Sequence, residues 1–206
     1  MLSPNAVPNK IKGNAYSRHF QGYIGVKVPK RNGNGFKIIQ IYTAPYHVHD
    51  MSDDSWKNHK LKISGLTLAA LGLYIFAAVC GADINKALFV AIPGCLAAFT
   101  LVFALTAIIF YLFCPRKMTI NDCTVSVRQV KRWTSISSFC TGIVAIMSLV
   151  YLLLFTQGRN IRECIVFFAY TASAISLFFI YKIENNTEYC EVENNTELPF
   201  YPGCDF

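Results

Sequence analysis

The residues best suited to bind a metal lie together in the segment His47-Val-His49-Asp50. Side chains two positions apart in an extended backbone share a face, so His47 and His49 could both reach one ion with Asp50 beside them. Imidazole nitrogen and carboxylate oxygen are typical ligands of zinc. No third histidine lies close in the sequence, and the acids that follow can serve in the first turn of a helix. The segment therefore offers a partial metal site at most, and we expect no bound metal.

Other kinds of chemistry lack their usual residues. The sequence contains no G-x-x-x-x-G-K-[S/T] or G-x-G-x-x-G pattern for nucleotides, no H-E-x-x-H pair and no G-x-S-x-G nucleophile motif. The eight cysteines include no C-x-x-C pair, so neither a zinc ribbon nor a thioredoxin-like centre is indicated. We therefore predict no catalytic residue and no cofactor, and we expect that the chain is not an enzyme.

Four long apolar runs decide the class of the molecule. None of them contains Asp, Glu, Lys, Arg or His, and they cover Ile63–Ala82, Ala87–Cys114, Trp133–Thr156 and Cys164–Tyr181. A helix of about 20 apolar residues crosses the hydrocarbon core of a bilayer. A charge at mid-bilayer costs at least about 2.5 kcal/mol. The runs predict a mainly α membrane fold, a bundle of four transmembrane helices.

The basic residues are distributed unevenly around these runs. If both termini face the cytoplasm, 16 of the 19 Lys and Arg residues lie on that side, which is the usual bias of membrane proteins. This distribution explains the net charge of +7 without nucleic acid, which we exclude as a partner. We expect one group of residues to lie at lipid headgroup depth and to set the topology: Trp56, Lys60, Lys62, Arg116, Lys117, Arg128, Lys131 and Arg132. Binding of anionic lipid by the basic loop among them is a further possibility.

A β-hairpin and a helix are predicted before the first span. Two strand-like segments, Tyr23–Pro29 and Phe36–Thr43, flank a turn rich in Asn and Gly, residues that tolerate the backbone of hairpin turns. A loop follows, and Ser52 or Asp53 can cap a helix that continues into the span. Residues 117–120 could add a strand to the hairpin.

The predicted regions follow from these elements. A flexible N-terminus covers residues 1–22, the cytoplasmic hairpin and pre-membrane helix 23–62, the transmembrane domain 63–182, and an acidic tail 183–206. The tail contains six acids and no base, and with little to bury we expect it to be disordered. Small residues recur on the spans at helical spacing, as in Gly65, Ala69 and Gly72. Packing within the bundle explains them, and homodimerisation is the alternative that the pattern does not distinguish.

One stretch of the chain resembles a group of known proteins. Its residues are Ile41-Tyr-Thr, Tyr46-His, His49-Asp50, Asp54-Ser-Trp-Lys57 and Lys60-Leu-Lys62, followed by Cys114-Pro-Arg-Lys-Met-Thr119. This pattern resembles small uncharacterised four-span membrane proteins of anaerobic Gram-positive bacteria, over residues 36–180. The resemblance implies a bacterial plasma membrane and no particular activity.

Three functions are compatible with these features. The first is a non-enzymatic accessory or scaffold subunit that binds a membrane-protein partner or a second copy of itself within the bilayer. The second is an oligomeric transporter or channel for neutral or apolar solutes, since no carboxylate lies within the runs. The third is a metal or lipid sensor that uses His47, His49 and Asp50.

Overall fold

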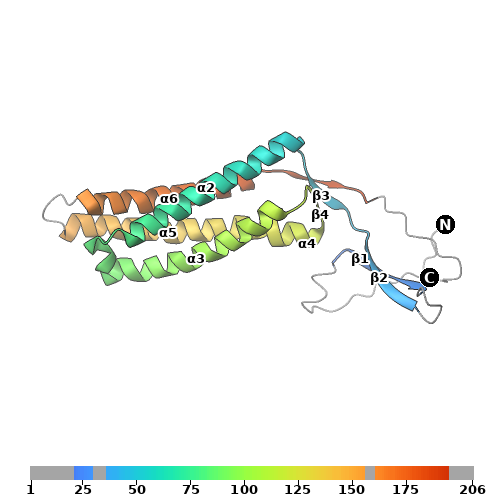
Figure 1. Cartoon of the computed structure of the whole chain (residues 1–206), viewed down its shortest axis with the longest axis horizontal. Helices are drawn as coiled ribbons and strands as arrows, with labels where there is room; N and C mark the ends of the chain where they lie inside the picture. Colours follow the sequence, from blue (N-terminus) through green and yellow to red (C-terminus); the bar gives the residue numbers. More distant parts are fainter. Residues whose placement is uncertain (1–20, 30–35, 156–160, 195–206) are drawn as a thin grey trace. The chain divides into compact units, whose positions relative to one another are not determined.

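Four long helices dominate the fold, and they lie side by side along one direction (Figure 1). The computed structural model describes residues 21–29, 36–155 and 161–194. The helices are α2 (Asp53–Val79), α3 (Leu88–Phe113), α5 (Gln129–Phe155) and α6 (Ile161–Asn185). At about 1.5 Å per residue each is roughly 40 Å long, which exceeds the bilayer core of about 30 Å. All four are long enough and apolar enough to span a membrane, and the predicted mainly α fold with four spans is confirmed.

Helix α2 begins at Asp53 with Ser52 as its N-terminal cap, as the sequence predicted. The Ser52 side chain accepts a hydrogen bond from the backbone N–H of Ser55 at 3.4 Å, and Asp53 and Asp54 occupy the first turn. A serine in this place satisfies one of the backbone donors that a helix leaves open at its start. The helix then continues unbroken through Ile63 into the first apolar run.

The helices pack side by side in an order that differs from their order in the chain. Helix α6 packs along both α5 and α2, and α3 packs along α5, whereas the consecutive helices α2 and α3 touch much less. A 3-10 turn, η1 (Asp83–Lys86), joins α2 to α3. We call the end with the start of α2 and the end of α6 the proximal end, and the end with η1 the distal end.

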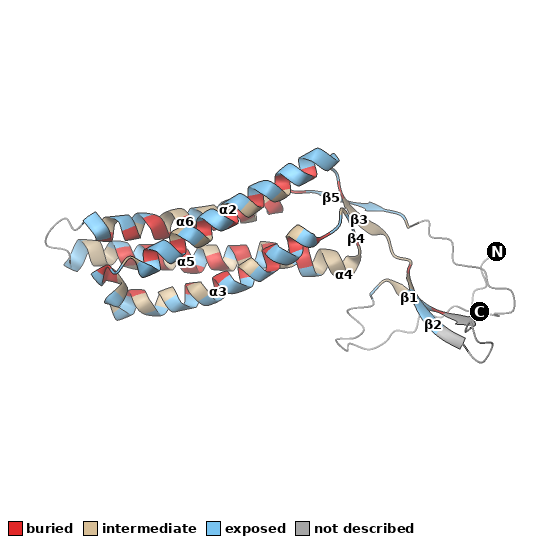
Figure 2. Ribbon diagram, in the orientation of Figure 1, coloured by how far each residue is buried: buried red, intermediate tan, exposed pale blue. Residues whose placement is uncertain are grey.

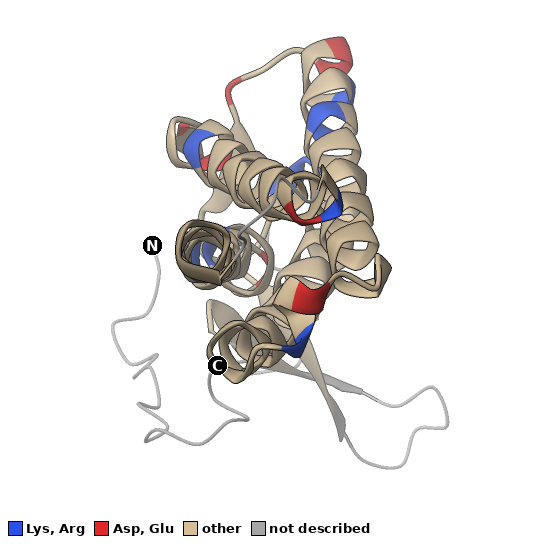
Figure 3. Ribbon diagram, turned by 90° about the vertical axis from the view of Figure 1, so that its left-hand side faces the viewer, with Lys and Arg blue, Asp and Glu red and all other residues tan. Residues whose placement is uncertain are grey.

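The outer faces of the helices are apolar. In the most apolar part of each helix only 28–39% of the residues are buried, and buried and exposed positions alternate along each helix ribbon (Figure 2). Leu68, Phe139 and Leu153 are each more than two-thirds exposed. Viewed along the bundle, most of the helix surface carries no Lys, Arg, Asp or Glu (Figure 3). Such a surface is stable in lipid rather than in water, and the chain is a multi-pass membrane protein.

Some of the small residues on the spans serve the interior, but the group on α2 that we singled out does not. Ala145 and Ser173 are buried between helices, as expected. Gly65, Ala69 and Gly72, however, lie on the exposed face of α2, and a Cβ atom added to either glycine would meet nothing within 4 Å. Packing within the bundle therefore does not explain these three residues, because their spacing fixes a common face but not its direction.

Side-chain hydrogen bonds to backbone carbonyls connect the helices. The Ser173 hydroxyl of α6 donates to the carbonyl of Ala70 on α2 at 2.8 Å. The Ser138 hydroxyl of α5 donates to the carbonyl of Ala174 on α6 at 3.0 Å. At the distal end the Asn85 amide donates to the Ala77 carbonyl at 2.7 Å and so satisfies the last turn of α2.

The predicted hairpin is present, and a second sheet accompanies it. Strands β1 (Tyr23–Pro29) and β2 (Phe36–Tyr42) pair antiparallel, with Tyr23 opposite Tyr42. The turn between them lies outside the described residues. A three-stranded sheet has the order β4-β3-β5, formed by Lys117–Met118, Tyr46–His49 and Tyr189–Val192. Residues 117–118 therefore pair with β3, which we expected to be a loop, and not with the hairpin.

The predicted disordered tail needs correction over the part that the structure describes. Helix α6 continues to Asn185, three residues beyond Lys182, and β5 follows it. The Asn194 amide donates to the Tyr42 carbonyl at 2.7 Å. Backbone pairing and these contacts order a segment whose composition alone indicated disorder. Residues 195–206 and the predicted flexible residues 1–20 lie outside the described part of the chain.

The chain forms two compact units. The helical unit contains His49–Pro115 and Thr124–Glu188, and the other unit holds the hairpin, most of the three-stranded sheet and Arg116–Cys123. The region 23–62, predicted as one domain, is thus divided, because α2 belongs entirely to the bundle. A five-residue π turn, η2 (Thr124–Arg128), follows α4 (Ile120–Cys123) and leads into α5.

Two buried serines give a test of the bundle. We expect Ser173→Ala to destabilise the protein by about 0.6–1.7 kcal/mol, the range for hydrogen bonds between membrane helices. Ser148 on α5 is equally buried but has no hydrogen-bond partner among the described residues. Ser148→Ala should therefore leave stability unchanged or raise it. Unfolding in mixed detergent micelles measures both, and an equal loss in both variants would contradict the assignment.

Candidate functional site

A cluster of buried polar and aromatic side chains lies at the proximal end of the helical unit. It joins the end of β3, the start of α2, the end of α3 and the end of α6. Its members are His49, Trp56, His59, Tyr111 and Glu184, which we call the proximal cluster. None of the five is more than 7% exposed. Trp56 and His59 are three residues apart on α2 and therefore share one face of that helix.

The centre of the cluster is a contact between the first and the last of the long helices. His59 Nε2 lies 3.2 Å from Glu184 Oε2, and the two residues are 125 positions apart in the sequence. Glu184 is fully buried and His59 nearly so. A buried carboxylate is costly unless hydrogen bonds and opposite charge compensate for the lost water. The imidazole of His59 offers a donor and, when protonated, a positive charge.

Aromatic rings enclose this pair. The Trp56 ring stacks on His59 with centroids 5.8 Å apart, and the His49 ring lies 5.6 Å from His59. Tyr111 from α3 meets Trp56 edge-on at 5.7 Å. Such rings exclude water and strengthen the electrostatic interactions between the groups they cover.

Lys60 connects the cluster to the end of α3. Its amine donates to the carbonyls of Leu112 at 2.9 Å and Cys114 at 2.7 Å, and it lies 4.8 Å above the centre of the Trp56 ring. The last carbonyls of a helix have no partner within the helix and carry partial negative charge. The amine of Lys60, which comes from α2, therefore donates hydrogen bonds to the open carbonyls at the end of α3 and places a positive charge beside their partial negative charge.

The π turn η2 lies against the same end of α3. Its Ser126 hydroxyl is 3.5 Å from the sulfur of Cys114, and both residues are buried. A π turn widens a helix by one residue and displaces the side chains that precede it. Here it places Ser126 and Val127 in the interior at the point where α5 begins.

The residues that we considered for metal binding are not brought together. His47 Nδ1 lies 3.9 Å from an oxygen of the exposed side chain of Glu191, while His49 belongs to the proximal cluster and Asp50 is exposed. Within residues 21–29, 36–155 and 161–194, no three His, Cys, Asp or Glu residues are placed to hold a metal ion.

The residues predicted for headgroup depth divide into two groups. Trp56 is buried in the proximal cluster and Lys60 bonds to α3, so their side chains contact protein. Arg132 is exposed, and its guanidinium lies 5.6 Å over the Trp133 ring, a pairing suited to an interface. The exposed members of the set are Lys62, Lys117, Arg128 and Arg132, and the partly exposed ones are Arg116 and Lys131.

Sequence reasoning missed the two central residues. We assigned Glu184 to the tail and gave His59 no role in chemistry. The periodicity of the helices contains the signal: Leu177, Ile180 and Glu184 follow one another at spacings of three and four on the buried face of α6. Trp56, His59 and Ile63 repeat this spacing on α2. Extending each stripe beyond its apolar run would have placed both residues inside.

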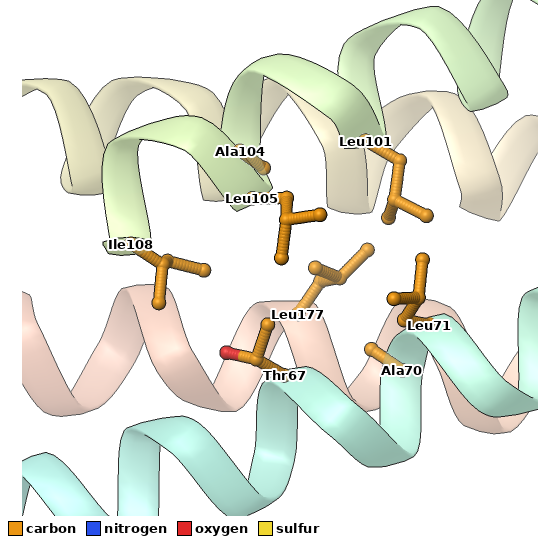
Figure 4. A pocket seen from close by; sticks show the side chains of 8 residues that line it. All are labelled: Thr67, Ala70, Leu71, Leu101, Ala104, Leu105, Ile108 and Leu177. Carbon is orange, nitrogen blue, oxygen red and sulfur yellow. The ribbon is translucent and has the colours of Figure 1, made fainter. Parts of the chain in front are cut away.

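A hollow lies where α2 and α3 separate (Figure 4). Its lining comes from α2, α3 and α6: Thr67, Ala70, Leu71, Leu101, Ala104, Leu105, Ile108 and Leu177. Its volume is about 10 Å³, roughly the space of one water-sized sphere. Small-molecule sites usually measure about 300–1,000 Å³. The hollow is therefore a packing gap and not a ligand pocket.

The strand unit has a polar centre of its own at Tyr42. The Tyr42 hydroxyl donates to the carbonyl of Pro45 at 2.8 Å and accepts from the backbone N–H of Ile120 at 3.1 Å. Partial burial raises the pKa of the Tyr42 hydroxyl above its ordinary value. This residue joins the hairpin to the segment that precedes α5.

No protein-family model, curated protein or solved structure matches the chain.

Lys60 gives a test of the proximal end. Lys60→Met keeps the length of the side chain but removes the donors to two carbonyls. We expect a loss of about 1.5–3 kcal/mol, the range for hydrogen bonds that involve a charged group, and faster hydrogen exchange in the last turn of α3. Lys57→Met is the matched control, because the Lys57 side chain is 78% exposed on the same helix. Equal stability of the two variants would contradict the role of Lys60.

Proposed function

We propose that the chain is a non-enzymatic accessory or scaffold subunit of a membrane complex. The observation that carries the proposal is how the bundle uses its polar groups. Ser173, Ser138, Lys60 and the His59–Glu184 pair are all engaged between helices. These groups hold the helices together, and the hollow at the α2–α3 seam is too small for a substrate. The unit of short strands adds a surface for protein contacts outside the spans.

The site of action in this proposal is the plasma membrane of a bacterium, with both termini in the cytoplasm. The distribution of basic residues supports this orientation, since the proximal end of the helical unit carries exposed Lys62, Arg128 and Arg132. At the distal end, Lys86 pairs with Asp83 at 2.7 Å. The Lys86 amine holds the pKa of Asp83 below its ordinary value. The positive charge of Lys86 is thus neutralised by Asp83. The exposed basic residues of the proximal end, by contrast, can attract anionic lipid headgroups.

An oligomeric transporter or channel for neutral or apolar solutes is the second candidate. The observation that favours it is the α2–α3 seam, where two consecutive helices separate and apolar side chains line the gap (Figure 4). Association of several copies along this seam would enclose more space than one bundle does.

Isolation of the complex separates these two functions. We expect the tagged chain, extracted from native membranes in mild detergent, to recover the same membrane protein in fixed ratio. A four-span protein of unrelated sequence with the same tag is the control. In liposomes the purified chain should release no neutral solute faster than protein-free vesicles. Recovery of a homo-oligomer alone, together with solute release, would support the transporter and overturn the scaffold.

Cysteine labelling tests the orientation. In a variant without native cysteines, Lys86→Cys should react with a membrane-impermeant maleimide on intact cells. Arg128→Cys should react only after the cells are opened, because the proposal places the proximal end inside. The reverse pattern would invert the topology.

A further inference from the structure

We propose that the start of α5 binds the headgroup of an anionic phospholipid, and that an aromatic strip on α5 and α3 receives an acyl chain of the same molecule. The inference goes beyond the scaffold role, and only the leaflet that supplies the lipid follows from the proposed orientation. We call the residues that form this surface the lipid face: Arg128, Lys131, Arg132, Trp133, Phe103 and Phe99.

The three basic residues of the lipid face lie on one side of a helix. Arg128 ends η2 and α5 follows it directly, so spacings of three and four residues bring Lys131 and Arg132 to the same side. Both arginines are exposed and Lys131 is partly exposed. The three therefore present one patch of positive charge to the surroundings of the bundle.

This positive charge is not neutralised by acids in the part of the chain that the structure describes. There, no Asp or Glu oxygen lies within ion-pair distance of any of the three bases. Lys57 and Lys86, by contrast, each lie near an acid three residues before them in the chain. The patch on α5 is thus suited to an anion that comes from outside these residues.

Aromatic rings continue from the bases along the surface of α3. The Arg132 guanidinium lies 5.6 Å from the centre of the Trp133 ring. The Trp133 ring stacks on Phe103 with centroids 4.6 Å apart, and Phe103 meets Phe99 edge-on at 4.9 Å. Phe103 is 38% exposed and Phe99 62%. Since α3 starts at the distal end, the step from Phe103 to Phe99 leads about 6 Å deeper into the span.

The combination of charge and apolar surface identifies the ligand. A free phosphate or an acidic protein segment would satisfy the bases but leave the exposed rings uncovered. A phospholipid satisfies both, because its acyl chain covers the rings while its phosphate reaches the bases. Guanidinium groups bind phosphate through paired N–H donors at their edge, which stacking on a ring leaves open. An anionic headgroup also gains from all three charges.

The direction of α5 favours contact with headgroups. The Cα–Cβ bonds of a helix tilt toward its N-terminus. Helix α5 begins beside η2, which packs against α3, at the proximal end. The tilt therefore directs Lys131 and Arg132 toward the membrane surface at that end, as is usual for long basic side chains at an interface.

Tryptophan fluorescence tests the proposal on the full chain. The sequence contains two tryptophans, and Trp56→Phe leaves Trp133 as the only reporter. Phosphatidylcholine vesicles contain either brominated phosphatidylglycerol or brominated phosphatidylcholine at equal fractions, and bromine quenches tryptophan on contact. We expect phosphatidylglycerol to bind beside Trp133 about tenfold or more tightly. Both leaflets hold the same mixture, so the result does not depend on the orientation of the chain.

Substitutions separate a bound lipid from general attraction to a charged surface. Arg132→Gln should weaken the preference for phosphatidylglycerol about fivefold, roughly the effect of one charge near the membrane. Arg132→Lys keeps the charge without the stacked guanidinium and should weaken it about twofold. Lys62→Gln is the matched control, because Lys62 is exposed on α2 at the same end, and it should leave the preference unchanged. Equal losses in Arg132→Gln and Lys62→Gln would overturn the site.

Two other results of the quenching experiment would also overturn the proposal. Equal quenching by the two brominated lipids would mean that lipid covers the face without selection. Quenching by neither would mean that protein covers it, for instance a second copy of the chain. If Trp56→Phe does not fold, native mass spectrometry of the wild type in detergent with equal amounts of both lipids takes its place. Phosphatidylglycerol should then be retained in preference, less so in Arg132→Gln, and equal retention would contradict the proposal.

Discussion

The structure depends on one constraint: inside a bilayer, polar groups must find their partners within the protein. Several serine and threonine hydroxyls of the spans meet it by donating to backbone carbonyls, either in their own helix, as Thr134 does to Val130, or in a neighbour, as Ser173 does to Ala70. At the proximal end Lys60 and the His59–Glu184 pair meet the same need with ionisable side chains. The constraint thus accounts for both the uncharged spans and the position of the charges.

The sorting of polar groups along the bundle bears on function. Hydrogen bonds from serine hydroxyls connect the helices in its middle. Ionisable side chains lie at both ends: His59 and Glu184 at the proximal end and Glu163 at the distal end. The ends of the bundle therefore carry the ionisable groups that can meet the surroundings of the membrane, while its middle presents only neutral groups to lipid.

The sequence predicted the spans because an apolar stretch of about 20 residues without a charge is typical of a helix that crosses a bilayer. It also predicted the hairpin, whose turn residues and alternating strands lie close together in the chain. It did not reveal the sheet of β3, β4 and β5, since these strands lie about 70 residues apart and their pairing leaves no local pattern. Glu184 and His59 were missed because an apolar run ends at its first charge while the helix continues. Trp56 was assigned to the interface because composition cannot tell which face of α2 meets another helix.

The separation of 125 residues between His59 and Glu184 has a consequence for synthesis. At about 5–20 residues per second, the ribosome needs about 6–25 s after making His59 before Glu184 exists. Until Glu184 is made, His59 lacks its carboxylate partner, and α2 lacks α6, against which it packs most extensively. The bundle therefore closes only when its last helix arrives, and a chain truncated before α6 would leave the first span without its main neighbour, exposed to quality-control proteases.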